Sequence, residues 1–292
     1  MEAIQYRGRL APSPTGFLHP GHLSTFHVAA QRCAESKGTL VFRMEDLDRA
    51  RCKPEFDAAC MEDLRPFFDW QEGPDVGGAF QPYRQSERHA RSTYLHYWTL
   101  LRDRGWIYPC SQSRRKIRAS QQSLSIVSGP GGEIPFPVSL RGDTEQARMY
   151  DTPGLQAFRF CVPNETIEFQ DINIGKVSYR AGEDFGDFLI WSVEGYPSYE
   201  FAVVVDDFLM RITEVVRGQD LLLSTARQIL IYRALDLPIP AFYHCPLLLN
   251  SSGERLSKRK GSVTIRGLQE DGWSKESILR GCNSQSPDPA LI

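Results

Sequence analysis

The sequence lacks a long apolar run, an excess of one charge and any signal for export. No apolar stretch approaches the ~18 residues that a membrane helix needs, and the first residues contain no apolar signal core. The 34 Lys and Arg nearly balance the 36 Asp and Glu, so any contact with nucleic acid must come from local basic patches. We therefore expect a cytoplasmic protein without membrane contact.

Closely spaced cysteines are also missing. The seven cysteines contain no Cys-x-x-Cys pair, which argues against a disulfide framework and a zinc knuckle and favours a reducing compartment. With 292 residues, 41% of them hydrophobic and 24% charged, the chain is too long for a small stapled scaffold and too apolar for a disordered one. We expect an ordinary globular protein of about two domains.

Strand and helix patterns alternate at the start of the chain, which is typical of a parallel α/β sheet. A Pro/Ser/Gly-rich loop at residues 11–21 connects the first predicted strand to the first predicted helix. The predicted strands of this part are residues 6–10 and 39–44, and the predicted helices are residues 22–36, 54–68 and 86–104.

Proline and glycine become frequent over residues 105–186, where we expect short strands such as 155–162 and 166–171 and no sustained amphipathic helix. This change in composition indicates a small inserted domain. The sheet is then expected to resume, with residues 188–193, the apolar run 201–205, a helix at 221–234, a strand at 244–249 and a short helix near 274–280. The predicted divisions are residues 1–105, 106–186, 187–250 and 251–292.

The loop after the first predicted strand ends in His19-Pro-Gly-His22. The free N–H groups at a helix N-terminus bind phosphate, and two histidines three residues apart lie on one face of the first turn. Gly21 lets a flat ligand approach the backbone closely. The alternative is a proline-rich turn that carries two surface histidines.

A second cluster, residues 253–261, is glycine- and lysine-rich and contains Arg255-Leu-Ser-Lys-Arg259. Such a loop can fold over a triphosphate, with Lys258 as a point charge on oxygens that become more negative during reaction. The alternative is a solvated run of charge.

Together the two clusters resemble the paired motifs of the class I aminoacyl-tRNA synthetases. Four further strings make the resemblance specific to glutamyl-tRNA synthetases, and it covers residues 9–261. It implies a Rossmann-type parallel sheet domain interrupted by a small mixed α/β insertion. The strings are Arg9-x-Ala-Pro-Ser-Pro-Thr-Gly, Arg43-Met-Glu-Asp-Leu-Asp, Tyr199-Glu-Phe-Ala-Val-Val-Val-Asp-Asp and Thr213-Glu-Val-Val-Arg-Gly.

The resemblance implies that ATP, as a complex with Mg²⁺, activates glutamate, which is then transferred to tRNA. Its catalytic groups would be His19, His22 and Lys258. The remaining implied site residues are Pro12, His19, Gly21, His22, Ser257 and Lys258 for ATP, and Arg9, Ala11, Ser13, Glu45, Tyr199 and Arg217 for glutamate.

These implied roles agree with the chemistry of the side chains. A planar guanidinium pairs with a carboxylate through two hydrogen bonds, which suits Arg9 and Arg217, and Glu45 matches the residue that holds the amino group. Glu200 stands where relatives usually have a neutral amide, so its carboxylate either points away from the anionic substrate or alters specificity. Asp206 and Asp207 are left without a role, because they are equally suited to cap a strand end.

The short members of this family attach glutamate to the queuosine base of tRNA(Asp). Since the sequence ends at Ile292, soon after the lysine loop, we expect that substrate and a monomeric enzyme. The alternatives are a truncated enzyme charging tRNA(Glu) and a synthetase-like protein that binds without turnover. The candidate RNA contacts in the insertion are Trp106, Arg114, Arg115, Lys116 and Arg118. The alternative interpretation, a solvated basic turn, is equally consistent with the sequence.

The insertion of these short enzymes often binds zinc through Cys-x-Cys and Tyr-x3-Cys. The corresponding positions here are Cys110 with Gln112 and Phe136 with Leu140, which leave one usual ligand of four. Because tetrahedral zinc needs N, S or O donors, we expect no structural zinc.

Overall fold

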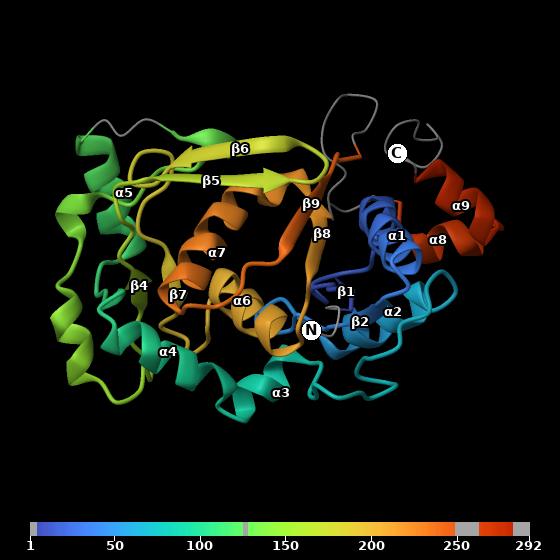
Figure 1. The fold of residues 1–292 in the computed structure, drawn as a ribbon, viewed down its shortest axis with the longest axis horizontal. Coiled ribbons are helices and arrows are strands. Elements are labelled where there is room, and N and C mark those ends of the chain that lie inside the picture. The colour runs from blue at the N-terminus through green and yellow to red at the C-terminus, as the bar shows by residue number, and fades with distance from the viewer. Residues whose placement is uncertain (1–4, 125–127, 249–262, 283–292) are drawn as a thin grey trace. The chain divides into compact units, whose positions relative to one another are not determined.

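The structure is a computed structural model in which residues 5–124, 128–248 and 263–282 are described. The chain forms two compact units (Figure 1). Unit 1 contains residues 1–88, 211–219 and 240–292, and unit 2 contains residues 89–210 and 220–239. Among the described residues no helix is both long and apolar enough to cross a bilayer. The sequence-based division at residues 105, 186 and 250 remains a prediction.

Unit 1 is built on parallel strands, as the alternating pattern predicted. Strand β1 (Arg7–Leu10) pairs with β2 (Thr39–Phe42), and β8 (Glu214–Gly218) pairs with β9 (Ala241–Cys245). Figure 1 shows β8 and β9 side by side. The mixed α/β class with parallel sheet elements is therefore confirmed.

Hydrogen bonds place β1 beside β8. The amide of Thr213 donates to the carbonyl of Arg7 at 2.9 Å, and Nη1 of Arg9 donates to the carbonyl of Val216 at 2.7 Å. The two strands are therefore neighbours within unit 1. Within each parallel pair the carboxyl ends of the two strands share one edge, and α/β sheets bind ligands at such edges.

Helix α1 (Pro20–Glu35) follows β1 and covers the sheet with one apolar face. Its buried side chains recur at helical spacing and pack in one core with residues of β1, β2, β8 and β9. Each leucine, valine or phenylalanine among them contributes about 1.5–3 kcal/mol on full burial. These side chains are Leu23, Phe26, Ala29 and Cys33 of α1, with Leu10, Leu40, Phe42, Val216 and Cys245 of the strands.

The other helices of unit 1 are short and lie along the same core. Ile265 and Leu268 of α8 and Ile278 of α9 belong to it, and the amide of Ile265 donates to the carbonyl of Leu18 at 2.9 Å. These helices are α2 (Pro54–Leu64), α8 (Ile265–Glu270) and α9 (Lys275–Gly281), while α3 (Gln85–Ala90) leads into unit 2.

Unit 2 contains a small antiparallel sheet and a hairpin. The sheet has the order β3 (Ile107–Pro109), β4 (Phe158–Phe160) and β7 (Leu189–Trp191). The hairpin consists of β5 (Thr166–Asp171) and β6 (Gly175–Arg180), paired along their whole length (yellow in Figure 1). The short strands predicted between residues 155 and 171 are thus present.

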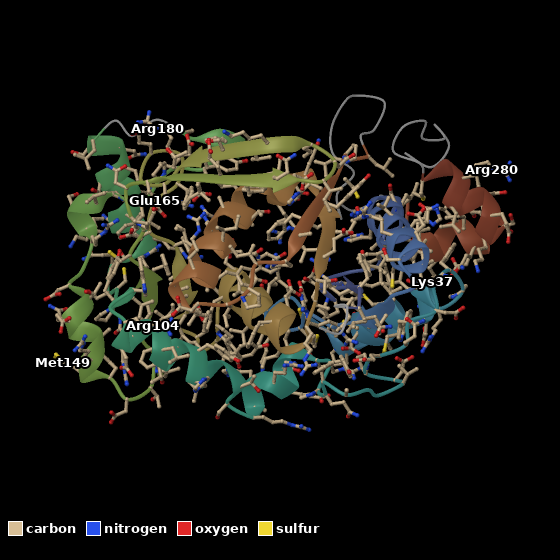
Figure 2. The ribbon with its side chains drawn as sticks, in the orientation of Figure 1. Lys37, Arg104, Met149, Glu165, Arg180 and Arg280 are labelled. Atoms are coloured by element: carbon tan, nitrogen blue, oxygen red, sulfur yellow. The ribbon has the colours of Figure 1, made fainter. Side chains whose placement is uncertain are left out.

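Four α-helices complete the described part of unit 2. Hydrogen bonds connect three of them: the Tyr94 hydroxyl of α4 donates to Asp206 of α6 at 3.0 Å in the core, and Arg104 at the end of α4, labelled in Figure 2, donates to the carbonyl of Ala234 in α7 at 2.7 Å. The helices are α4 (Thr93–Asp103), α5 (Arg114–Ser123), α6 (Tyr199–Leu209) and α7 (Leu222–Ala234). The 3₁₀ turns are Pro130–Gly132, Val138–Leu140, Thr144–Met149 and Gln219–Leu221.

The apolar run 201–205 is helical, so its interpretation as part of the sheet was wrong. Ser198 caps the helix by accepting from the amide of Phe201, and every residue from 201 to 207 is buried. Periodicity does not separate a buried strand from a helix that is buried on all sides. Asp206 and Asp207 accordingly lie within α6 and do not cap a strand.

Three further predictions needed correction. The helix expected at 86–104 is broken by Ser92, whose φ is 58°, and the insertion does contain a helix, α5, none of whose residues is buried. The last strand lies at 241–245 instead of 244–249.

Candidate active site

The two histidines of the loop after β1 form the N-terminal cap of α1. Nδ1 of His19 accepts from the amide of Gly21 at 3.1 Å, and Nδ1 of His22 accepts from the amide of His19 at 3.3 Å. Their ring centroids are 3.9 Å apart. This is a capping box in which imidazoles replace the usual hydroxyl and carboxylate.

The cap fixes the chemistry of both rings. Because each Nδ1 accepts a hydrogen bond, the proton of each neutral imidazole is on Nε2, which is a donor. The first turn of α1 therefore presents donors together with the positive end of the helix dipole, an arrangement suited to phosphate oxygens. Glycine is favoured at position 21, because a Cβ there would lie 3.0 Å from the His19 ring and would crowd it.

Buried charges lie at the carboxyl ends of β1 and β2. Arg9 is fixed by its bond to the carbonyl of Val216, and the fully buried Arg43 donates to Oε1 of Glu45 at 2.9 Å. The amide of Glu45 also donates to the carbonyl of Pro12 at 3.0 Å, which positions the residue beside the loop after β1. Arg43 was quoted in the sequence motif but given no role; it orients Glu45.

Arg217 lies near the end of β8 and is also buried. Its Nε donates to Nε2 of His244 at 3.2 Å, from the facing position on β9. Since arginine is always a donor, His244 must be unprotonated at that nitrogen. His244 was missed in the sequence, because a single histidine in an apolar strand is most often an ordinary core residue.

The remaining predicted site residues fall into three groups. Ala11 and Ser13 belong to the loop after β1 in unit 1, with Ser13 exposed and its carbonyl accepting from the amide of Thr15 at 2.8 Å. Tyr199 is the first residue of α6 in unit 2, with 36% of its surface exposed. Ser257 and Lys258 lie outside the described residues.

Glu200, the unusual neighbour of Tyr199, is bound to helix α7. Its Oε1 accepts from the hydroxyl of Ser224 at 3.2 Å and lies 3.6 Å from Nη1 of Arg227. The negative charge is therefore compensated within unit 2.

Side chains at the expected zinc-ligand positions pack in an apolar cluster. Cys110 and Phe136 are buried together, and Leu140 and Cys161 pack against them. Two thiols with a phenyl ring and an isobutyl group do not make a tetrahedral donor set, and burial raises the pKa of the Cys161 thiol, which disfavours the thiolate that binds metal. Within the described residues no three His, Cys, Asp or Glu side chains are grouped to hold a metal ion.

We predict that the purified protein contains no stoichiometric zinc, because three of the four usual ligand positions carry Gln112, Phe136 and Leu140. Elemental analysis of the protein after dialysis against a chelator measures this directly. One tightly held zinc per chain would contradict the prediction.

A parallel sheet whose first strand leads into a histidine-capped helix defines a nucleotide-binding α/β protein. The family described as tRNA synthetases class I (E and Q), catalytic domain, matches residues 5–286. The chain belongs to this family of ligases, which implies ATP as a substrate.

Individual relatives agree with the family. The chain is 42% identical over 276 residues to a protein of Symbiobacterium thermophilum named glutamyl-Q tRNA(Asp) synthetase, covering 93% of this chain and 84% of that protein. It is 39% identical to a glutamate–tRNA ligase of Sulfurihydrogenibium sp., of which it spans 56%. Among solved structures, the glutamate–tRNA synthetase of Elizabethkingia anophelis matches with a TM-score of 0.72 and 28% identity, over 92% of this chain and 54% of that one.

Replacing Arg9 or Arg217 with alanine is expected to impair the use of glutamate more than the binding of ATP. A substrate carboxylate that is buried without its guanidinium partner has an uncompensated desolvation cost. We expect the KM for glutamate to rise at least about tenfold, which corresponds to ~1.4 kcal/mol. Pyrophosphate exchange at varied glutamate and varied ATP measures both constants, and an equal loss for ATP would contradict the assignment.

Proposed function

We propose that the protein activates glutamate with ATP and transfers it to the queuosine base of tRNA(Asp). The observation that carries this proposal is the 42% identity, over most of both chains, to a protein named glutamyl-Q tRNA(Asp) synthetase. The chain is also 39% identical to a second protein of that name, from Nitratidesulfovibrio vulgaris, and covers 83% of that protein.

In the first step an oxygen of the glutamate α-carboxylate attacks the α-phosphorus of ATP. The bond from that phosphorus to the bridging oxygen breaks, and pyrophosphate leaves. The Nε2–H donors of His19 and His22 are suited to bind phosphate oxygens, so the histidines stabilise charge and need not act as bases. Lys258 is assigned the same role from the sequence motif.

The glutamate pocket is assigned to the buried guanidinium groups of Arg9 and Arg217, with Glu45 for the ammonium group and Tyr199 as a further lining residue. The buried Arg43 and the neutral His244 hold two of these side chains in place. Fixed orientation matters because misplacement of a reacting carboxylate by 1 Å can cost about 100-fold in rate.

In the second step a hydroxyl of the queuosine attacks the carbonyl carbon of the adenylate. The hydroxyl loses its proton, the bond between the carbonyl carbon and the phosphate oxygen breaks, and AMP leaves. We also propose that ATP binds as its Mg²⁺ complex and that the protein is a cytoplasmic monomer; its seven cysteines are free, as in a reducing compartment.

The test compares four purified tRNAs as acceptors of radiolabelled glutamate. We expect transfer to queuosine-containing tRNA(Asp) and to the same tRNA without its terminal adenosine. Queuosine-deficient tRNA(Asp) and tRNA(Glu) should accept none. Efficient charging of tRNA(Glu) would favour the glutamate–tRNA ligase activity named for other relatives, and absence of glutamate-dependent pyrophosphate exchange would indicate a binding protein.

A further inference from the structure

Unit 2 contains a pocket of about 380 Å³ that the reaction described above does not use. Its lining comes from α5, the loop at residues 133–136, β4, β7 and the N-terminal turns of α6 and α7. Ser198 and Glu200, which flank Tyr199 in the sequence, are among its lining residues. Pockets of this volume take ligands the size of a nucleoside.

Flat surfaces dominate the walls. The guanidinium of Arg159 lies over the ring of Phe136, 4.3 Å from its centroid, and the guanidinium of Arg227 lies 5.8 Å from the centroid of Phe188. Ile134 and Leu189 add aliphatic surface at positions where their side chains are partly exposed. Guanidinium planes and aromatic rings are the groups on which nucleobases stack.

Positively and negatively charged groups line the same pocket. Glu133 pairs with Arg227 at 2.7 Å, and Glu200 lies 3.6 Å from the same guanidinium. Among the described residues, the buried Nε atoms of Arg159 and Arg227 have no hydrogen-bond acceptor. Buried donors without acceptors are unfavourable and require an explanation, such as a functional role.

This combination selects one kind of ligand. The carboxylates of Glu133 and Glu200 oppose a polyphosphate, while Asp187 is already bound by Arg141 and Tyr108 within the fold. A purely apolar ligand would leave the polar groups of the wall without additional hydrogen-bond partners. A nucleobase has apolar faces and an edge of donors and acceptors, and enzymes that act on a base bind it outside the stack between such side chains. The amine and diol of queuosine add donors that suit Glu133 and Glu200.

We propose that this pocket binds the acceptor base of the RNA, turned out of the anticodon loop. Phe136, Phe188 and the arginine planes form its faces, and Glu133 and Glu200 bind its amine and hydroxyl groups. The proposal rests on the proposed function, since it names the part of the enzyme that receives the second substrate.

The decisive variant fills the pocket without touching the core. Ile134 is 44% exposed, so Ile134→Trp places an indole in the cavity with little effect on folding. We expect kcat/KM for transfer to queuosine-containing tRNA(Asp) to fall at least about tenfold, while glutamate-dependent pyrophosphate exchange stays within about twofold. Ile172→Trp is the matched control, because Ile172 is 47% exposed and lies in the turn between β5 and β6; both activities should stay unchanged.

A second pair of variants tests the recognition of the base by charge. Glu133→Gln removes a carboxylate from the pocket, and Glu165→Gln removes one from a comparable ion pair elsewhere in unit 2, with Arg233 at 3.5 Å (Glu165 is labelled in Figure 2). Saturation-transfer NMR with the free queuosine nucleoside measures binding without catalysis. Glu133→Gln should weaken that binding at least about fivefold, and Glu165→Gln should leave it as in the wild type.

The outcomes separate this proposal from the proposed function. Unchanged transfer by Ile134→Trp overturns the base pocket, and so does an equal loss of exchange and transfer in a folded variant. If the wild type transfers no glutamate to queuosine, the proposed function fails, and the NMR measurement still decides the pocket. The base pocket is supported if the wild type binds the nucleoside and Ile134→Trp abolishes that binding. It is overturned if the wild type does not bind the nucleoside.

Discussion

Lys258→Ala is expected to slow glutamate-dependent pyrophosphate exchange about 30- to 1,000-fold, or about 2–4 kcal/mol in the barrier. The reason is chemical: negative charge grows on the phosphate oxygens as pyrophosphate leaves, and a preorganised ammonium stabilises it more than it stabilises bound ATP. Lys258 lies outside the described residues, so the prediction depends on the motif Arg255-Leu-Ser-Lys-Arg259.

The matched control is Lys260→Ala, in the same basic segment but beyond the motif. It should retain exchange within about threefold, because loss of a solvated charge changes a rate only slightly. Near-wild-type exchange by Lys258→Ala, or an equal loss in both variants, would remove Lys258 from the mechanism.

Glu214→Ala is expected to lower the free energy of unfolding by about 3 kcal/mol, the range for breaking a buried ion pair from one side. The Glu214 carboxylate accepts from Nε and Nη2 of Arg32 at 2.5 and 2.8 Å and from the Tyr6 hydroxyl at 2.8 Å. Its side chain is only 7% exposed. Burial, reinforced by this carboxylate, raises the pKa of Tyr6, so the tyrosine remains a donor. The bonds fasten β8 to α1 and to the segment before β1.

Urea unfolding measures the change, and Glu168→Ala is the control. Glu168 pairs with Lys176 at 2.9 Å across the hairpin, but both side chains are more than half exposed, so its loss should cost no more than ~1 kcal/mol. A loss below ~1 kcal/mol for Glu214→Ala would show that the pair contributes little to stability.

The parts of the fold that the sequence predicted are those with local signals. Helix α1 was placed within two residues at its start, because a Pro/Ser/Gly-rich loop gives way there to a helical pattern; the loop was drawn two residues too long, since Pro20 is already the first residue of the helix. The hairpin strand at 166–171 was placed at its actual bounds. The parallel arrangement followed from the alternation of strands and helices.

Other parts depend on contacts that no local pattern contains. Strand β8 was quoted only as a motif, and its place beside β1 rests on bonds between residues more than 200 positions apart in the sequence. Helix α6 was misread because burial on every side removes the polar face that distinguishes a helix.

The same distinction holds for the candidate site. The histidine cap combines residues three apart, so the sequence indicated it, although it did not indicate which nitrogen of each ring is the acceptor. His244 and Arg217 are 27 positions apart and meet only through the pairing of β8 and β9. Sequence alone therefore indicated the candidate substrate-binding groups better than the groups that hold them in place.

Phe136 limits how this protein can be engineered. It belongs both to the apolar cluster with Cys110 and to the wall of the pocket in unit 2, beneath Arg159. Rebuilding a four-ligand metal centre by Gln112→Cys, Phe136→Tyr and Leu140→Cys would place a hydroxyl in that shared wall and remove an aliphatic side chain behind it. A designer who grafts a metal centre for thermal stability would therefore alter the pocket in the same step, and the two properties have to be optimised together.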